Sequence, residues 1–262
     1  MRFSVITLFP ELIEYIFSKG VVGQAHQAQL IQVECVNPRT FTEDVHKTVD
    51  DRPFGGGDGM IMLVEPLVQS LNSLISPQAK VIYMSPQGVP LTDQKVTELS
   101  SEKQLILICG RYGGIDQRFI NEFVDEEISI GDYVLSGGEL AAAVLIEAVS
   151  RKLPGVLGNQ QSSEMDSFSN QRLEEPCFTR PRECLGQSVP EVLLSGNHKK
   201  IQDWRSKLRD LVTLKKRPDL LKMNSLQISS LKRFWSAMPD SEKKALGLDH
   251  FPTSSLADQT DP

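Results

Sequence analysis

Residues 131–138, Gly-Asp-Tyr-Val-Leu-Ser-Gly-Gly, are the part of this sequence best suited to ligand binding. Glycine accepts positive φ angles and lets a ligand approach the main chain with no Cβ in the way. Residues 127–130 before this segment are typical of a strand, and residues 139–151 after it are typical of a helix. Ser136 and Glu139 have capping-box spacing, which predicts that they fix the start of that helix. The alternative is a short strand-to-helix connection without a ligand.

Two further glycine-containing segments follow apolar runs. The run 80–84 ends at Ser-Pro-Gln-Gly (85–88), and the run 105–109 ends at Gly-Arg-Tyr-Gly-Gly (110–114). Continuous apolar runs of this length are typical of strands that helices cover on both faces of a parallel sheet. Ligands of open α/β sheets bind beyond the carboxyl ends of the strands. The three glycine loops are therefore predicted to form one pocket built mostly from backbone groups.

The residues of these loops limit which class of ligand the pocket can bind. No loop has the Gly-x-x-x-x-Gly-Lys-[Ser/Thr] pattern of a P-loop, and none has a dinucleotide Gly-x-Gly-x-x-Gly pattern with an acidic residue suitably downstream. A backbone pocket with few cations suits a neutral or positively charged ligand, such as an adenosine compound.

Length, charge and cysteine content limit the class of protein. The chain has 262 residues, enough for one large domain and one small one. Its net charge of −6 does not point to a nucleic-acid binder. Four cysteines without a Cys-x-x-Cys pair indicate reduced thiols rather than zinc ligands or disulfides. No apolar stretch approaches the roughly 18 residues of a membrane span, so we expect a cytoplasmic protein with no membrane partner.

The amino-terminal segment is predicted to open the larger domain. Residues 3–8 are typical of a strand, and Pro10 is well suited to the first turn of the helix that follows. The residues expected on the buried face of this helix are Leu12, Ile13, Ile16 and Phe17.

Residues 198–222 are basic although the chain as a whole is acidic. They contain nine Lys and Arg residues but three Asp residues. Ile201, Trp204, Leu208 and Leu211 recur at helical spacing, so they are predicted to face a core while most cations face outward. This segment is either a solvated helix face or a helix that contacts phosphates.

Short motifs along almost the whole sequence resemble those of the bacterial tRNA (guanine-N1)-methyltransferases, which belong to the SPOUT class. Their order and spacing together are very specific. The resemblance implies an enzyme that uses S-adenosylmethionine to methylate N1 of guanosine at tRNA position 37. The motifs are Ile6–Pro10, Thr48–Gly57, Tyr83–Gly88, Cys109–Tyr112, Ser129–Leu140, Pro154–Gly158 and Leu193–His198.

The resemblance also implies a fold. We expect an α/β domain with a mostly parallel sheet and a deep trefoil knot, followed by a small all-helical domain. A homodimer is implied, in which the linker of one subunit reaches over the cofactor of the other. The expected divisions are a methyltransferase domain at 1–160, a linker at 161–176 that carries the catalytic Asp, a helical tRNA-binding domain at 177–250 and a disordered tail at 251–262.

Matching the family's motifs assigns binding residues in this sequence. The residues expected to bind S-adenosylmethionine are Tyr83, Ser85, Pro86, Gly110, Gly114, Ile130, Gly131, Tyr133, Leu135, Gly137 and Gly138. The residues expected to bind tRNA are Asp50, Arg52, Gly59, Arg111, Ser195 and His198. A flexible surface turn is the alternative interpretation of the glycines around Gly59. The expected substrate is a tRNA with guanosine at positions 36 and 37.

The proposed reaction needs a base, because guanine N1 carries a proton and is a poor nucleophile until that proton leaves. The family assigns the base to a linker Asp that matches Asp166, and it assigns a cation near guanine O6 to an Arg that matches Arg151. Without the resemblance, Asp166 would be an ordinary linker residue and Arg151 would compensate a helix dipole.

One departure from the family pattern concerns magnesium. The family usually has Arg-Tyr-Glu-Gly where this chain has Gly113 in place of Glu, and that Glu has been linked to magnesium dependence. Gly113 therefore argues against a role for magnesium, which the resemblance leaves as a possible second cofactor. No metal ligands are predicted, and the acidic residues near Gly113 in the sequence are Glu122, Asp125, Glu126 and Glu127.

Two rival functions remain, a catalytically silent tRNA-binding protein and a ribose 2′-O-methyltransferase with the same knot. The presence of both Asp166 and Arg151 argues against the first. The linker carboxylate and the helical carboxyl-terminal domain argue against the second.

Overall fold

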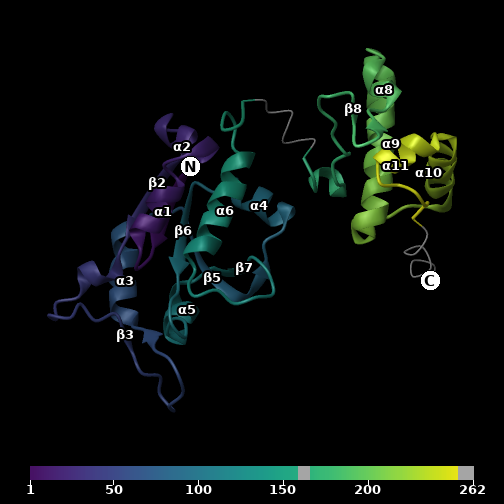
Figure 1. Cartoon of the computed structure of the whole chain (residues 1–262). Coiled ribbons are helices and arrows are strands. Elements are labelled where there is room, and N and C mark those ends of the chain that lie inside the picture. Colours follow the sequence, from purple (N-terminus) through teal and green to yellow (C-terminus); the bar gives the residue numbers. More distant parts are fainter. Residues whose placement is uncertain (159–165, 253–262) are drawn as a thin grey trace. The chain divides into compact units, whose positions relative to one another are not determined.

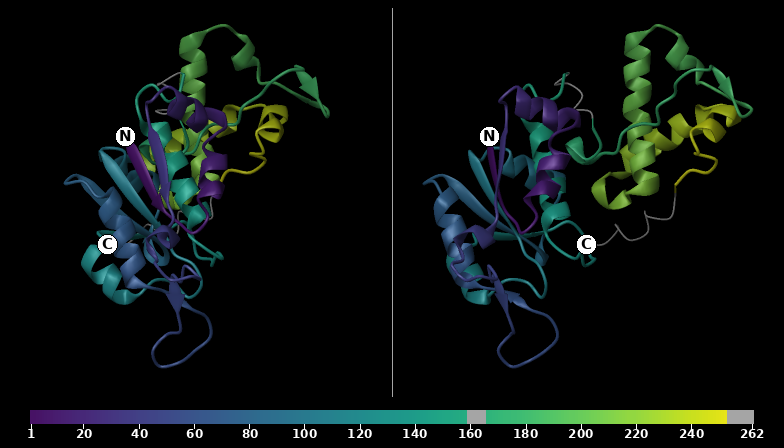
Figure 2. Two further views of the ribbon diagram at one scale, coloured as in Figure 1. Left: turned by 90° about the vertical axis from the view of Figure 1, so that its left-hand side faces the viewer. Right: turned by 60° about the vertical axis from the view of Figure 1, so that its left-hand side comes forward.

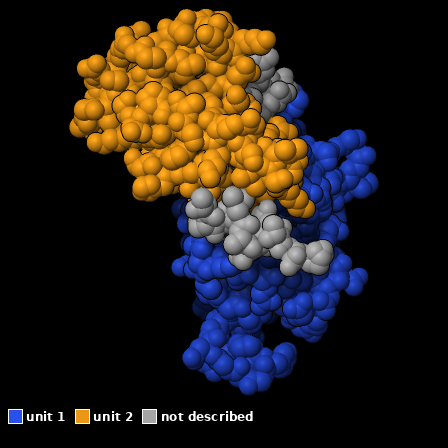
Figure 3. Space-filling view, turned by 90° about the vertical axis from the view of Figure 1, so that its right-hand side faces the viewer, with its two compact units in different colours: residues 1–163 blue, residues 164–262 orange. Residues whose placement is uncertain are grey.

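The computed structural model describes residues 1–158 and 166–252. The chain forms two compact units, Met1–Ser163 and Glu164–Pro262, which Figure 3 distinguishes by colour. Most of the predicted tail and the first part of the predicted linker lie outside the described residues. No helix in the described ranges is both long enough and apolar enough to cross a membrane.

The first unit is built on a parallel sheet of five strands in the order β2-β1-β6-β5-β7. This arrangement confirms the mixed α/β prediction, whereas the trefoil knot stays a prediction. The strands are β1 (Arg2–Ile6), β2 (Gln32–Val36), β5 (Ala79–Pro90), β6 (Gln104–Cys109) and β7 (Glu126–Ser129). A separate antiparallel hairpin pairs β3 (Asp50–Asp51) with β4 (Ile61–Met62), and the loop between these strands projects away from the sheet (Figures 1 and 2).

Helices cover both faces of the sheet, as the continuous apolar strands predict. Leu105 and Leu107 of β6 belong to one buried cluster, and Ile106 and Ile108 belong to another, because successive side chains of a strand point to opposite faces. The first cluster includes residues of α1 (Pro10–Ile16), α2 (Gly20–Gln27), α4 (Asp93–Leu99) and α6 (Glu139–Lys152). The second includes residues of α3 (Val64–Leu74) and α5 (Gln117–Phe123), while η1 (Pro38–Phe41) packs beside α3.

The segment Ser85–Gly88, predicted as a loop after a strand, instead lies inside β5. The strand continues to Pro90, with a register shift against β7 between Met84 and Val89. Gly88 explains how the strand resumes, because a Cβ there would lie 2.3 Å from the carbonyl carbon of Glu127. The irregular residues therefore leave the regular sheet while both of their ends remain anchored to it.

The predicted buried face of α1 is only half correct. Ile13 and Phe17 are buried, but Leu12 and Ile16 are 43% and 39% exposed. This short helix packs against β2 and α6, and Leu12 and Ile16 lie partly outside those contacts. Leu140 and Val144 on α6 are also exposed. The two helices thus leave apolar side chains uncovered.

Over residues 166–252 the second unit is helical apart from one short hairpin. Trp204, Leu208 and Leu211 are buried in its core, as their spacing predicts, while Ile201 is only partly buried. Arg209 is also buried, so not every cation of the basic segment faces solvent. The elements are η2 (Ser169–Gln171), β8 (Glu183–Cys184), β9 (Gln187–Ser188), α8 (Glu191–Leu194), α9 (His198–Lys216), η3 (Pro218–Leu220), α10 (Ser225–Ala237) and α11 (Asp240–Ala245).

An ion-pair network ties β5 and α4 to β7. The Lys80 and Lys95 ammonium groups lie 3.0 and 2.8 Å from the two carboxylate oxygens of Glu126. Burial, the largest single effect, raises the pKa of Glu126, but the hydrogen bonds and positive charges of Lys95 and Lys80 together lower it more, so the net shift is downward. A carboxyl group with a lowered pKa in the folded state stabilises the protein above its unfolded pKa, and this contribution is lost as the pH falls through the folded pKa.

We expect Glu126→Gln to lower the free energy of unfolding by about 1 kcal/mol at pH 7, because two partly buried ammonium groups lose their counter-charge. Urea unfolding followed by circular dichroism measures this change. The difference from wild type should shrink below about pH 4, where the wild-type carboxyl group is increasingly protonated. Glu98→Gln, on the exposed side of the same network, should have a smaller effect. A loss of equal size at both pH values would contradict the ion-pair explanation.

Candidate active site

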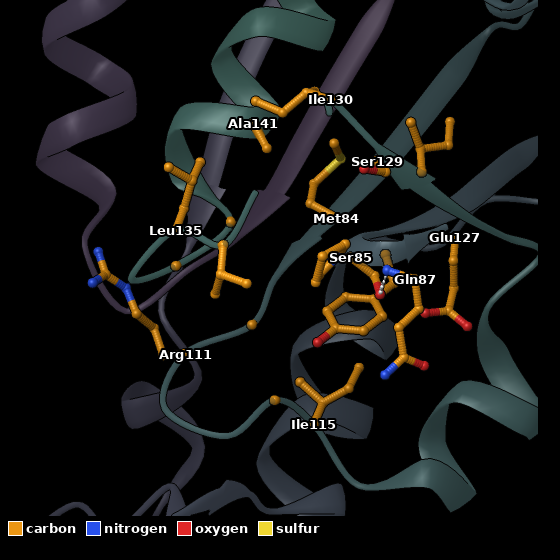
Figure 4. A pocket seen from close by; sticks show the side chains of 18 of the residues that line it. Met84, Ser85, Gln87, Arg111, Ile115, Glu127, Ser129, Ile130, Leu135 and Ala141 are labelled. Carbon is orange, nitrogen blue, oxygen red and sulfur yellow. Dashed lines mark hydrogen bonds between the residues drawn. The ribbon is translucent and has the colours of Figure 1, made fainter. Parts of the chain in front are cut away.

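A pocket of about 440 Å³ lies at the carboxyl ends of β6 and β7, beside the irregular middle part of β5 (Figure 4). Its volume is within the range of pockets that bury a small ligand. The residues predicted to bind the cofactor come from all three glycine segments, and the structure brings every one of them to the lining of this pocket. That they bind a cofactor stays a prediction.

Backbone contacts hold the second and third glycine segments together. The Gly138 N–H donates to the Gly110 carbonyl at 3.1 Å, and Arg111 pairs with Gly137 as an antiparallel bridge. A Cβ on Gly138 would lie 2.8 Å from Cys109 Cα, so a glycine is required by close approach rather than by its φ angle. Tyr112 has a φ of 58°, a conformation that non-glycine residues seldom adopt and that clusters at functional sites.

Glu139 is the buried anchor of this arrangement, with 2% of its surface exposed. Its carboxylate accepts hydrogen bonds from Thr7 Oγ1 at 2.8 Å and Arg111 Nε at 3.1 Å, and Arg111 Nη2 lies 3.0 Å from its second oxygen. We call Thr7, Arg111 and Glu139 the Glu139 clamp. It joins the end of β1, the loop after β6 and the start of α6. Arg111 also donates to the Ser136 carbonyl, and its guanidinium group lies 4.4 Å from the centre of the Phe9 ring.

The predicted capping box at Ser136 and Glu139 is wrong. Gly138 occupies the N-cap position of α6, and no side chain caps the helix there. The Glu139 carboxylate pairs with Arg111 and Thr7 instead, because a buried charge is much more stable beside a cation than beside a neutral amide. The pKa of the neighbouring Cys109 thiol is raised, first by burial and then by the Glu139 charge, so this cysteine is an unreactive core residue.

The hairpin that carries Asp50, Arg52 and Gly59 is bound to one wall of the pocket. The Gly113 N–H donates to the Met60 carbonyl at 2.8 Å, and the Met62 N–H donates to the Gly114 carbonyl at 3.0 Å. The predicted tRNA-contacting hairpin is thus fixed to a predicted cofactor loop. A Cβ on Gly113 would lie 3.0 Å from the Met60 carbonyl oxygen, which makes this position tight for a larger residue.

The remaining predicted site residues belong to other parts of the chain. Arg151 lies in the last turn of α6, in the first unit. Asp166, Ser195 and His198 belong to the second unit, where His198 is the exposed first residue of α9. The Ser195 hydroxyl donates to the Val192 carbonyl and accepts from the Asn197 N–H. Within the described ranges, no group of three or more His, Cys, Asp or Glu residues is placed to hold a metal ion.

A family model described as tRNA (Guanine-1)-methyltransferase TrmD matches residues 1–223, which include every element of the pocket and helix α9. The chain belongs to this family. Curated relatives named tRNA (guanine-N(1)-)-methyltransferase are similar over most of their length. The relative from Hydrogenovibrio crunogenus is 52% identical over 84% of this chain and 94% of its own. The relative from Alcanivorax borkumensis is 56% identical over 83% of this chain and 84% of its own.

Sequence reasoning missed two groups of residues in this TrmD family member. It assigned no role to Thr7 and placed Glu139 in a helix capping box. The hydrogen bond between these residues could not be foreseen, because they are 132 positions apart and meet only in the folded protein. Sequence reasoning gave Gln87 and Glu127 no role and named Glu127 only as one of four acidic residues near Gly113, whereas the structure places Glu127 and Gln87 along the pocket lining. For Glu127 the available signal was its position in the strand just before the third glycine segment.

We expect Glu139→Gln to reduce the free energy of unfolding by about 2 kcal/mol, because Arg111 would keep a largely buried charge without a counter-charge. Binding of S-adenosylmethionine, measured by calorimetry, should weaken at least about fivefold as the two loops separate. Glu147→Gln, an exposed position on the same helix, is the matched control and should change neither quantity. Wild-type cofactor affinity in Glu139→Gln would show that the clamp does not hold the pocket.

We also expect Gly138→Ala to destabilise the protein by about 1–3 kcal/mol, because its methyl group would collide with the Cys109 backbone. Thermal unfolding measures the effect. Gly158→Ala is the control, since a Cβ there would meet no atom within 4 Å. Equal unfolding temperatures for the two variants would contradict this prediction, because they would mean that the β6 backbone can shift away from the methyl group without loss of stability.

Proposed function

We propose that this enzyme transfers a methyl group from S-adenosylmethionine to N1 of guanosine 37 of tRNA, in the cytoplasm. Membership of the TrmD family carries the proposal. The glycine-rich pocket beside β5, β6 and β7 supports it, because its lining suits such a cofactor. The ribose 2′-O-methyltransferase and the silent protein are not favoured, because the family and the relatives are named for guanine-N1 methyl transfer.

The lining of the pocket fits S-adenosylmethionine. Glycines at 110, 114, 131, 137 and 138 leave backbone groups accessible, and several of these positions have no room for a Cβ. Ser129 fixes the turn at Gly131, since its hydroxyl donates to the Gly131 carbonyl and accepts from the Gly131 N–H. When bound, the cofactor supplies a methyl group already activated by a sulfonium sulfur.

Asp166 is proposed as the base and Arg151 as the stabilising cation. The Asp166 carboxylate accepts the proton of guanine N1, and the freed N1 electron pair forms the bond to the methyl carbon. The electron pair of the broken carbon–sulfur bond remains on sulfur. The Arg151 guanidinium group stabilises negative charge that develops on guanine O6.

The second unit holds the main chain of Asp166 in place. The main-chain carbonyl of Asp166 accepts hydrogen bonds from the Ser169 N–H at 3.2 Å and from Arg209 Nη2 at 3.5 Å. Arg209 is buried, and its Nε also donates to the Leu173 carbonyl. We propose that α9 thereby has two tasks: Arg209 positions the segment of the base, and exposed cations on the same helix contact phosphates of a tRNA with guanosines at positions 36 and 37.

A homodimer is part of the proposal. Leu12, Tyr15 and Ile16 of α1 and Leu140 and Val144 of α6 are exposed apolar side chains on two adjacent helices. Apolar side chains gathered in this way are typical of a surface that a second chain covers. In the family, the linker of one subunit reaches over the cofactor of the other subunit. Such an arrangement would explain why Asp166 belongs to the second unit of this chain while the cofactor pocket belongs to the first.

We expect Asp166→Asn to reduce methyl transfer by about 10²–10⁴-fold, because an amide cannot accept the N1 proton. The measurement is a single-turnover assay with labelled S-adenosylmethionine and a tRNA transcript that has guanosine at positions 36 and 37. Affinities for cofactor and tRNA should stay within about twofold of wild type. Mapping of the label to N1 of guanosine 37, and its absence from a transcript with adenosine there, tests the reaction itself.

Asp249→Asn is the matched control, an exposed aspartate of the same unit. It should retain the wild-type rate. A near wild-type rate in Asp166→Asn would remove Asp166 as the base while leaving the identity of the reaction intact.

A further inference from the structure

Two side chains that are charged at pH 7 line the pocket among the described residues, Arg111 and Glu127. They lie on opposite sides of the pocket in Figure 4. The Arg111 charge is already matched, since Nε and Nη2 contact the two carboxylate oxygens of Glu139. With Arg111 neutralised by the Glu139 clamp, the carboxylate of Glu127 determines the net charge of the pocket, which is negative.

Strand pairing directs Glu127 into this pocket. Glu127 of β7 is in register with Tyr83 of β5, a residue that also lines the pocket. Successive side chains of a strand point to opposite faces, so Glu126 turns to Lys80 and Lys95 while Glu127 turns to the other face. The pKa of Tyr83 is raised, first by burial and then by the Glu127 charge, which agrees with a carboxylate close to the phenol.

The Glu127 carboxylate has no hydrogen-bond or ion-pair partner within residues 1–158 and 166–252. It is only partly exposed. The side chain drawn beside it in Figure 4 is the Gln87 amide, which is neutral and cannot match its charge. A partly buried carboxylate without a cation is unfavourable, so this side of the pocket is prepared for a positive charge.

The cofactor and its product differ in one positive charge. S-adenosylmethionine carries an ammonium, a carboxylate and a sulfonium, whereas S-adenosylhomocysteine has a neutral thioether in place of the sulfonium. The adenine, the ribose and the amino-acid groups are common to both. We infer that Glu127 makes the pocket select the sulfonium cofactor over its neutral product, an inference that rests on the proposed function.

This selection acts in the direction that turnover needs. The carbon–sulfur electron pair stays on sulfur during methyl transfer, so the attraction to Glu127 disappears with the sulfonium charge. The product therefore binds less tightly than the cofactor and leaves the pocket. For charges several ångströms apart in a partly solvated pocket, the attraction corresponds to about a threefold to tenfold difference in affinity.

The test compares the affinities of wild type and Glu127→Gln for S-adenosylmethionine and for S-adenosylhomocysteine by calorimetry at low salt. We expect the variant to bind the sulfonium compound about threefold to tenfold more weakly and the thioether within about twofold of wild type. Inhibition of methyl transfer by the product should become correspondingly stronger relative to the KM for cofactor. Glu127→Asp, which keeps the charge, should restore most of the preference.

Glu122→Gln on α5 is the control, because it removes one exposed negative charge outside the pocket and should leave both affinities unchanged. Equal weakening of both ligands in Glu127→Gln would overturn the inference and place Glu127 beside a group that they share, such as the ribose or the ammonium. Unchanged affinities for both would also overturn it. Wild-type protein that binds neither compound would instead remove the cofactor assignment of the proposed function.

Discussion

The pocket depends on one buried carboxylate. Glu139 is held by Thr7 from β1 and by Arg111 from the loop after β6, while the helix that begins at Glu139 follows the glycine loop of residues 131–138. A buried charge of this kind is stable only when every contact is made. The end of β1, the loop after β6 and the start of α6 are consequently fixed together. The same interaction sets the position of the glycine loop 110–114 relative to the glycine loop 131–138.

The glycines and the clamp have complementary tasks. Gly137 and Gly138 give the backbone enough room to pass Arg111 and Cys109, since a Cβ at either position would overlap these residues. The clamp neutralises Arg111, the only cation lining the pocket in the described part of the chain. A wall of backbone groups without a net positive charge suits a cationic sulfonium ligand and would bind phosphates poorly, which agrees with the absence of a P-loop lysine from the sequence.

Much of the site could be predicted from the sequence because its signals are local. The apolar runs that became β5 and β6, and the glycine segments beside them, are read within a few residues of one another, and the family's motifs assign the same positions. Other predictions failed where residues far away in the sequence determine the contacts of a side chain. Ser136 and Glu139 have capping spacing, but Arg111 competes for the carboxylate. Leu12 has the spacing of a buried residue, but it remains exposed on α1, whose Ile13 packs into the core.

Glu126 and Glu127 separate what the sequence determined from what the fold decided. The sequence by itself determined a strand there, a glycine loop after it and membership of a tRNA methyltransferase family. The sequence could not show which of these two adjacent glutamates faces the pocket. Pairing of β7 with β5 turns Glu126 to two lysines and Glu127 to the pocket. The physical reason is that side-chain direction alternates along a strand, whereas the charge environment on each face comes from segments far away in the chain.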